Sequence, residues 1–239
     1  MSENLRIKKG LNINLVGTAA HTTSKAVTSN VYAINLNDFY GMMPKLMVKQ
    51  GAEVKAGEPI FYNKDNNEMV FVSPVSGEVV EIIRGARRKI LTIKILADKE
   101  QEVIAHKPLD LDRASDEDVR AFLLKSGCWP FIKQRPYDLI ANPETTPKAI
   151  FISAYVTAPL AAETDYTLQG REKEIQAAIT ALGKMTPGLI HVSIGKNGDS
   201  PFNKIEDIAL HKVTGPHPAG LVGTQINKID PINKGELVW

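Results

Sequence analysis

The sequence has little cysteine and no long apolar run, and these absences exclude several classes of protein. Its 239 residues contain one cysteine, Cys128. That excludes an internal disulfide, and it excludes an iron–sulfur cluster held by this chain's thiolates alone. A reducing, cytosolic location is therefore expected. No apolar stretch approaches the roughly 18–20 residues that cross a bilayer, and the N-terminus lacks the apolar centre of a secretory signal.

An excess of one charge is also absent. Lysine and arginine number 29 against 27 aspartate and glutamate, which gives a net charge of +2. A dedicated nucleic-acid binder normally has a strongly basic face, so no nucleic-acid partner is predicted. The histidines show no ligand spacing and the serines no nucleophile motif, so neither a metal site nor a catalytic residue is predicted. The residues considered were His21, His106, His191, His211, His217, Ser73, Ser76 and Ser153.

Residues 48–85 carry a repeated pattern of short apolar runs interrupted by glycine. Gly51 and Gly57 punctuate the first half, and Gly77 and Gly85 the second. Glycine permits tight corners, and the valine, isoleucine and phenylalanine between them favour strands. The pattern predicts two related hairpins folded onto each other, as in the β-sandwiches that carry lipoyl or biotinyl groups. We assign this β domain to residues 1–100.

A carrier of that kind needs an acceptor lysine at a tight hairpin tip, and Lys64 lies in the corresponding region. The tip around it, residues 63–68, reads as long and polar, without the short lysine turn that modifying ligases recognise. The sequence therefore predicts an ordinary surface lysine and no covalent attachment site. A lipoyl or biotinyl carrier domain stays as an alternative.

The second half of the chain changes to an α/β pattern, assigned to residues 101–239. A helix is predicted after the Ser115 region, with Val119, Phe122 and Leu123 at helical spacing and Gly127 as its stop. Residues 148–155 and 188–195 read as buried strands around an amphipathic helix at 171–185. A third apolar stretch follows at 205–213. The expected fold class is a barrel-sandwich hybrid followed by a Rossmann-like α/β domain with a partly parallel sheet.

A nucleotide site is not predicted in this α/β domain. The loop after the first strand has no glycine before Gly170, so the G-x-G-x-x-G fingerprint is missing. The backbone therefore cannot approach a pyrophosphate closely, and we expect neither FMN nor NADH to bind.

Three loops stand out for their composition, and each leaves two interpretations open. GPHPAGLVGT, residues 215–224, is a structural turn or a loop that faces a ligand or partner, with Gly215, His217, Gly220 and Gly223 as candidates. Residues 129–137 pack in the core, or line an aromatic ligand or an interface through Trp129, Phe131, Lys133 and Arg135. The basic turn of Arg84, Arg87, Arg88 and Lys89 is a solvated hairpin tip or a surface for an anionic partner.

Several of these segments together resemble a known family. IKKGL at residues 7–11, SPVSGEVV and RGARR in the β domain, PKAIFISA, and above all GPHPAGLVGT are similar to the A subunit of the bacterial Na+-translocating NADH:quinone oxidoreductases. The resemblance covers essentially the whole chain, and it extends to the C subunit of Rnf complexes. Members of the family continue beyond the length of this chain, so a fragment is expected.

The resemblance implies a peripheral subunit on the cytoplasmic side of the membrane. Its complex couples NADH oxidation and quinone reduction to Na+ export, with NADH, FAD, FMN, Fe–S centres and quinone as cofactors or substrates of the whole complex. The expected partners are the other subunits and quinone. This chain is expected to be structural or quinone-proximal, to hold no cofactor of its own, and to be non-catalytic when isolated. A flavin-binding NADH dehydrogenase module is the other alternative.

Overall fold

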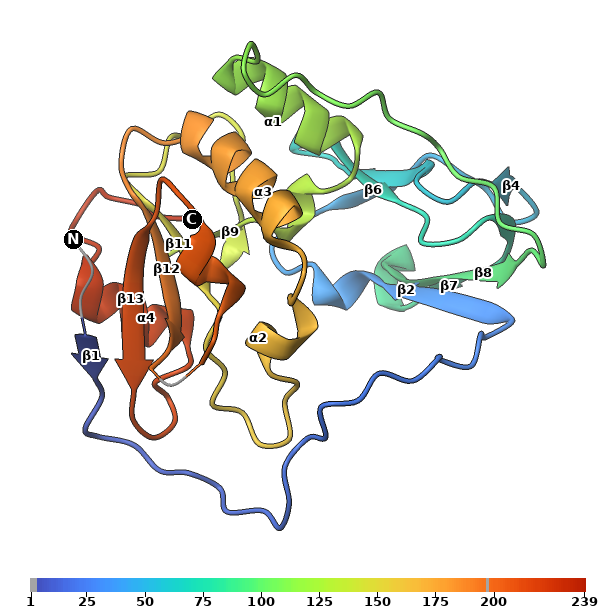
Figure 1. The fold of residues 1–239 in the computed structure, drawn as a ribbon. Coiled ribbons are helices and arrows are strands. Elements are labelled where there is room, and N and C mark those ends of the chain that lie inside the picture. Colours follow the sequence, from blue (N-terminus) through green and yellow to red (C-terminus); the bar gives the residue numbers. More distant parts are fainter. Residues whose placement is uncertain (1–3, 197) are drawn as a thin grey trace. The chain divides into compact units, whose positions relative to one another are not determined.

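The computed structural model describes residues 4–196 and 198–239, and the chain forms two compact units (Figure 1). The first combines the N-terminal residues up to Ser24 with Glu144–Trp239, and the second is Lys25–Pro143. In this division, residues 101–143 belong to the same compact unit as the β-rich part, and the N-terminal strand belongs to the same unit as the α/β part. The division into sequence domains 1–100 and 101–239 stays a prediction.

Two antiparallel sheets form the centre of the second unit. One has the strand order β2-β8-β7-β4 and the other β3-β5-β6. The hairpins β5–β6 and β7–β8 lie in different sheets, as predicted for two hairpins folded onto each other. The elements are β2 Val31–Asn35, η1 Leu36–Asp38, β3 Pro44–Leu46, β4 Glu53–Val54, β5 Pro59–Asn63, β6 Asn66–Val72, β7 Gly77–Arg84, η2 Ala86–Arg88 and β8 Ile90–Ala97.

Apolar side chains from both sheets fill the sandwich. Phe61 and Phe71 stack with their ring centroids 4.5 Å apart, and Phe39 meets Phe71 edge-on at 4.7 Å. Val79 and Ile93 are fully buried in the other sheet. Each such side chain contributes about 1.5–3 kcal/mol on burial, so this core holds the sandwich together.

The turn at Lys64 differs from the prediction. Strand β5 continues to Asn63 and β6 begins at Asn66, so only Lys64 and Asp65 form the turn. The expected long, loose tip is wrong: the backbones of Asn63 and Asn66 pair in the ladder, and Asn63 Oδ1 accepts a hydrogen bond from the Met43 N–H. Lys64 is exposed at a tight tip, so tip length no longer argues against a carrier. The intact mass of the purified protein decides that alternative.

Helix α1, Asp116–Lys125, follows the predicted signals at its ends. Ser115 caps it through a reciprocal capping box with Asp118, and Gly127 follows the helix at φ +73°. A Cβ on Gly127 would lie 2.7 Å from Val72, so the stop also lets the chain approach the sandwich closely. Val119 is buried as predicted, but the other fully buried position is Leu124, not Phe122 or Leu123.

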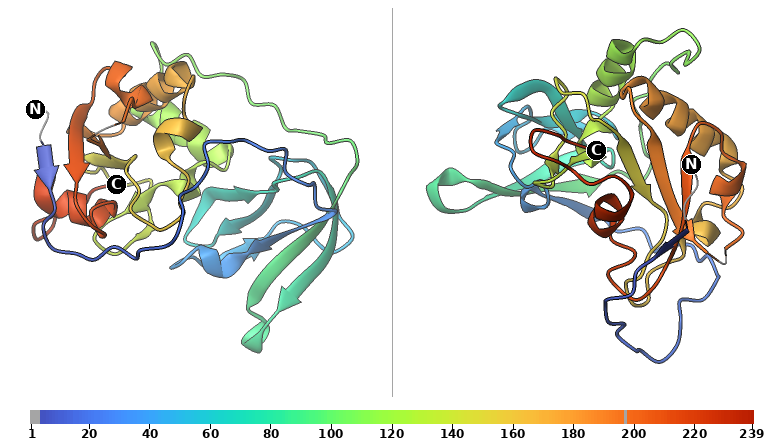
Figure 2. Two further views of the ribbon diagram at one scale, coloured as in Figure 1. Left: turned by 60° about the horizontal axis from the view of Figure 1, so that its bottom comes forward. Right: turned by 90° about the vertical axis from the view of Figure 1, so that its left-hand side faces the viewer.

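The first unit contains a four-stranded, wholly parallel sheet in the order β1-β13-β12-β11. The predicted β-α-β unit is present, and its helix α3 buries Ile175 and Ile179 but leaves Ala178 exposed. Helices α3 and α4 lie on opposite faces of the sheet (Figure 2). The elements are β1 Asn4–Arg6, β11 Ile150–Ser153, α2 Thr164–Thr167, α3 Glu172–Lys184, β12 Ile190–Gly195, η4 Pro201–Lys204, β13 Ala209–Thr214 and α4 Val222–Ile229.

Residues 237–239 bind along the outer edge of β11. The Phe151 N–H donates to the Trp239 carbonyl at 2.7 Å, and the Trp239 N–H donates to Ala149 at 3.2 Å. Lys148 fastens the preceding turn, because its Nζ lies 2.8 Å from Asp230 Oδ1 and 2.6 Å from Glu236 Oε2. These two ion pairs therefore hold the turn that leads into residues 237–239 against the start of β11.

The Lys148 cluster predicts a pH-dependent stability. Burial lowers the pKa of Lys148, but the hydrogen bonds that its ammonium donates to Asp230 and Glu236 outweigh burial and raise that pKa. The same contact with Lys148 lowers the pKa of Glu236. Glu236 therefore stabilises the fold above the ordinary glutamate pKa of about 4.3, and this stabilisation is lost as pH falls through the lowered pKa. Lys148→Met should lower the urea midpoint at neutral pH, and the difference from the unsubstituted protein should shrink in acid.

The matched control is Lys228→Met, which removes an exposed lysine of α4. It should leave the urea midpoint nearly unchanged at every pH. Equal effects of the two substitutions, or a Lys148→Met difference that does not vary with pH, would contradict this role for the cluster.

Candidate functional site

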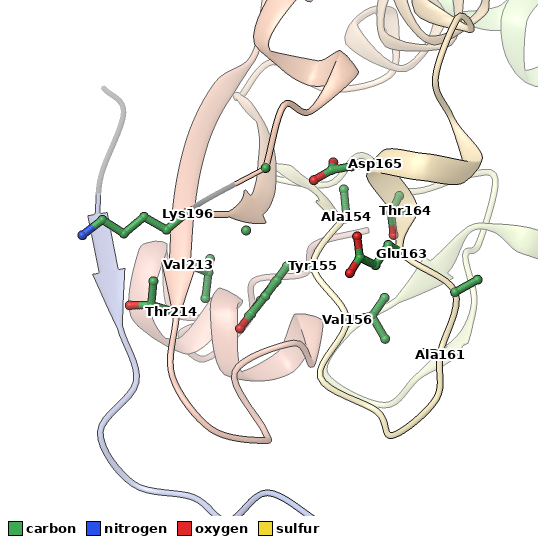
Figure 3. Close-up of a pocket in the computed structure, with 13 residues that line it drawn as sticks. Ala154, Tyr155, Val156, Ala161, Glu163, Thr164, Asp165, Lys196, Val213 and Thr214 are labelled. Atoms are coloured by element: carbon green, nitrogen blue, oxygen red, sulfur yellow. The ribbon is translucent and has the colours of Figure 1, made fainter. Parts of the chain in front are cut away.

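A cavity of about 340 Å³ lies at the carboxyl ends of β11, β12 and β13 (Figure 3). Strand β11 leads into Ala154 and Tyr155, β12 ends at Gly195, and β13 ends at Thr214. Parallel pairing brings these three ends to one edge of the sheet. Open α/β sheets bind their ligands at this edge, so the cavity is the candidate site of this unit.

The charged side chains that face the cavity are acidic. Glu163 and Asp165, from the connection between β11 and α3, approach it, whereas Lys196 extends away from them towards β1 (Figure 3). Glu163 Oε2 lies 3.1 Å from His21 Nε2. Asp165 Oδ1 is buried and has no hydrogen-bond partner among the described residues. The cavity therefore disfavours an anion and favours a group that donates hydrogen bonds.

Two of the amides that could bind a phosphate at the start of α3 are also occupied. Helix α3 begins with Glu172 and Glu174, and hydrogen bonds from their own backbone N–H groups are the main cause of their lowered pKa values. These carboxylates thus occupy two amides of the helix N-terminus, where a dinucleotide phosphate would otherwise bind. The sequence has glutamate, not glycine, at both positions.

The GPHPAGLVGT segment lies beside this edge and is held by several hydrogen bonds. Thr157 Oγ1 accepts from the Gly220 N–H at 3.1 Å and lies 3.0 Å from His217 Nδ1. The His217 N–H donates to Asn12 Oδ1 at 2.9 Å, and the Leu11 N–H donates to the His217 carbonyl at 2.9 Å. These contacts are those of a structural turn. The role of its residues toward a ligand or partner stays a prediction.

The three candidate glycines of this segment differ in their surroundings. A Cβ on Gly215 would overlap the Ile7 carbonyl oxygen, and a Cβ on Gly220 would lie 2.5 Å from the Thr157 nitrogen. Gly223 has open space around it and belongs to α4, which begins at Val222. The loop is thus shorter than the predicted 215–224, and close backbone approach explains only two of its three candidate glycines.

A buried polar layer lies under the turn, between the sheet and α4. Gln225 Nε2 donates to Ser153 Oγ at 2.9 Å and to the Ala219 carbonyl at 3.1 Å. His191 Nδ1 and His211 Nε2, on neighbouring strands, lie 2.9 Å apart. Ser153 and the two histidines therefore serve packing and hydrogen bonding inside the fold, with no nucleophile arrangement among them.

The other candidate loop belongs to the second compact unit. Trp129, in η3 Trp129–Phe131, is completely buried and its Nε1 donates to the Ala141 carbonyl at 2.7 Å, so it takes the core-packing alternative. Phe131 is 78% exposed. Lys133 begins β9 Lys133–Gln134, which pairs with β10 Leu139–Ile140, and Arg135 contacts Asp138 at 3.3 Å. Phe131, Lys133 and Arg135 can still face a partner.

The acidic residues of the cavity carry no signal in the sequence. Glu163 and Asp165 follow β11 by about ten residues, at the start of the short helix α2, where the sequence has no recognised motif. Their position became informative only once the parallel order of β11, β12 and β13 placed them at the same edge.

Among the described residues, no group of three or more histidine, cysteine, aspartate or glutamate side chains could hold a metal ion. No helix in that part of the chain is long and apolar enough to cross a membrane.

The fold and the site define a class of protein: a hairpin-based β-sandwich combined with an α/β unit whose nucleotide edge is acidic. Residues 5–98 match the family described as the NqrA N-terminal barrel-sandwich hybrid domain, and residues 114–239 match the NqrA second alpha/beta domain. The chain therefore belongs to the NqrA family. This confirms the resemblance and the fold class predicted from the sequence.

Curated relatives are named as the A subunit of Na(+)-translocating NADH-quinone reductase. The chain is 32% identical to that of Yersinia pseudotuberculosis serotype O:1b (strain IP 31758) over 237 residues. It is also 32% identical to the protein of Neisseria gonorrhoeae (strain NCCP11945) and 33% identical to that of Neisseria meningitidis serogroup A. Each match covers 98% of this chain but 53% of the relative, so the chain spans about half the length of these proteins.

The glycines of the turn give a matched pair of substitutions. Gly220→Ala should lower the free energy of unfolding by about 1–3 kcal/mol, because its Cβ would overlap the Thr157 backbone. Gly223→Ala should raise it by about 0.5–1 kcal/mol, because alanine favours the helix and meets no atom there. Urea denaturation measures both. Equal effects would show that the turn does not depend on close approach at Gly220.

Proposed function

We infer that this protein acts as the A subunit of a Na+-translocating NADH-quinone reductase, attached peripherally to the membrane subunits on the cytoplasmic side. The observation that carries this proposal is the match to relatives of that name over 98% of the chain, through both the sandwich and the α/β part. The complex would couple NADH oxidation and quinone reduction to Na+ export. Within it, this chain would position other components and would perform no redox step alone.

The electrostatics of the sheet edge support a role without a bound flavin or NADH. Both ligands carry phosphate groups, and the cavity presents Glu163 and Asp165 to them. At the N-terminus of α3 the amides of Glu172 and Glu174 already donate to their own carboxylates, and the negative charge of these carboxylates opposes the positive field of the helix. NADH, FAD, FMN and Fe–S chemistry would therefore reside on other subunits.

Protein purified in the presence of added FMN should contain no stoichiometric flavin, and NADH should not bind. Acidic residues would repel the phosphates at the edge that a Rossmann-like unit normally uses. Absorbance in the flavin region after gel filtration tests the first statement, and titration calorimetry tests the second. One flavin per chain would contradict the proposal and favour the flavin-dependent NADH dehydrogenase alternative.

A quinone-proximal role is the second part of the proposal. Phe131 offers an exposed aromatic ring, with Lys133 and Arg135 in the same loop. The Gly215–Gly220 turn is held by several hydrogen bonds and lies beside the sheet edge. Either loop could contact a quinone or the protein that holds it.

Deleting the gene of this chain from its own host should abolish Na+-dependent NADH:quinone reductase activity in membrane vesicles, and restoring the whole gene should recover it. Affinity-tagged protein from solubilised membranes should carry the other subunits of the complex. In that complex, a photoreactive quinone analogue should label one of the two loops.

Three results would count against this assignment. Unchanged activity after deletion would contradict membership of the complex, and so would recovery of the tagged protein without other subunits. Photolabelling confined to other subunits would contradict the quinone-proximal role while leaving membership of the complex intact.

A further inference from the structure

The β7–β8 hairpin ends in a concentration of positive charge. Arg84 closes β7, Arg87 and Arg88 lie in η2, and Lys89 precedes β8; all four side chains are exposed. Figure 2 shows this hairpin projecting beyond the neighbouring strands of its own unit, with η2 at its end. We call these four residues the basic tip.

The described residues do not neutralise the basic tip. None of its four cations forms an ion pair within the described part of the chain, whereas Lys94 in the stem of the same hairpin contacts Glu81 at 2.7 Å. Arg84 Nη1 donates to the Arg88 carbonyl at 3.2 Å, and Lys89 Nζ donates to Asn37 Oδ1 at 3.1 Å. The carboxylate nearest in sequence to that contact, Asp38, accepts a hydrogen bond from Asn35. The positive field of the tip therefore extends into solvent.

The backbone of the tip is one that arginine disfavours. Arg87 and Arg88 have φ values of 54° and 61°, so two consecutive side-chain-bearing residues occupy the left-handed region. Glycine or asparagine fills such positions at lower cost. Packing does not explain the choice, because no side chain of η2 is buried. A strained, exposed pair of cations points to a role outside the fold.

The composition of the tip distinguishes between kinds of anionic partner. Interfaces between proteins are anchored by a few tryptophan, tyrosine or arginine side chains in well-packed pockets, and the residues around each anchor exclude water. The arginines of the tip project into solvent, and the only other residues of the tip segment are Gly85 and Ala86, so nothing surrounds an arginine to make it such an anchor. A diffuse anionic surface needs no complementary pocket, and basic clusters bind such surfaces through charge alone.

We propose that the basic tip of the β7–β8 hairpin binds the anionic headgroups of a phospholipid membrane surface. This goes beyond the proposed function, which assigns the protein to membrane subunits, by giving it a direct contact with lipid. The contact would be electrostatic and superficial. It would orient the sandwich toward the bilayer without inserting any residue.

The test is co-sedimentation of the purified protein with vesicles, at low ionic strength, where charges act over about 30 Å. Vesicles of equal parts phosphatidylcholine and phosphatidylglycerol should retain the protein, and phosphatidylcholine alone should not. Each basic residue near such a surface strengthens binding roughly fivefold. Replacing all four with glutamine should therefore weaken binding on the order of several hundredfold.

The charge-matched control replaces four exposed lysines elsewhere in the same unit: Lys49, Lys64, Lys99 and Lys107. It should retain most of the binding, although the change in net charge is the same. A second variant, Arg87→Asn with Arg88→Asn, keeps the left-handed backbone favourable. It should unfold at an equal or higher urea concentration and yet bind roughly 25-fold more weakly.

Three results would overturn the proposal: no sedimentation with anionic vesicles at low salt, equal binding to both kinds of vesicle, or equal losses for the tip and control variants. Because the vesicles contain no other subunit, such a failure leaves the proposed place in the complex untouched. Conversely, vesicle binding by a protein that fails to join the complex would support the tip and refute the proposed place in the complex.

Discussion

The parallel pairing of β1 with β13 is the constraint on which the α/β unit depends. It joins residues more than 200 positions apart, and the Ile7 N–H continues it by donating to Thr214 at 2.8 Å. Gly215 must then pass within contact of the Ile7 carbonyl, and the His217 turn is held by Leu11 and Asn12. Along the chain, the sandwich therefore lies between β1 and the rest of the α/β unit, and β1 completes the sheet of that unit. Any change that loosens β1 also loosens the turn beside the candidate cavity.

A balanced net charge conceals a separation of charge within the chain. Carboxylates gather at the edge of the parallel sheet, where nucleotide-binding proteins of this topology need positive field and free amides. Unpaired cations gather at the tip of the β7–β8 hairpin. Each unit therefore has an electrostatic character of its own, and a total of +2 predicts neither. A chain whose charges nearly balance can therefore still carry a small and strongly basic contact surface.

Local patterns in the sequence predict most of the helices and strands. The features that these patterns do not predict depend on pairings between strands far apart in the sequence. The ends of α1 follow from Ser115 and Gly127, and α3 and its flanking strands follow from apolar spacing. The short turn at Lys64 was misjudged because asparagine and glutamate have low strand propensity, and cross-strand pairing with β5 outweighs it. Glu163 and Asp165 could not be found, because only the order of three strands brings them to one cavity.

The most specific sequence motif of the chain is explained by packing before any ligand is considered. At Gly215 and Gly220 the neighbouring backbone lies so close that no side chain fits, whereas Gly223 meets nothing. The polar partners of the turn, Thr157 and Gln225, are directed at its backbone and leave few groups for a bound molecule. A motif can therefore identify a family reliably although its residues serve the packing of a turn. Evidence for a ligand has to come from groups that the fold leaves available, and among the described residues these include the buried oxygen of Asp165 and the exposed cations of the basic tip.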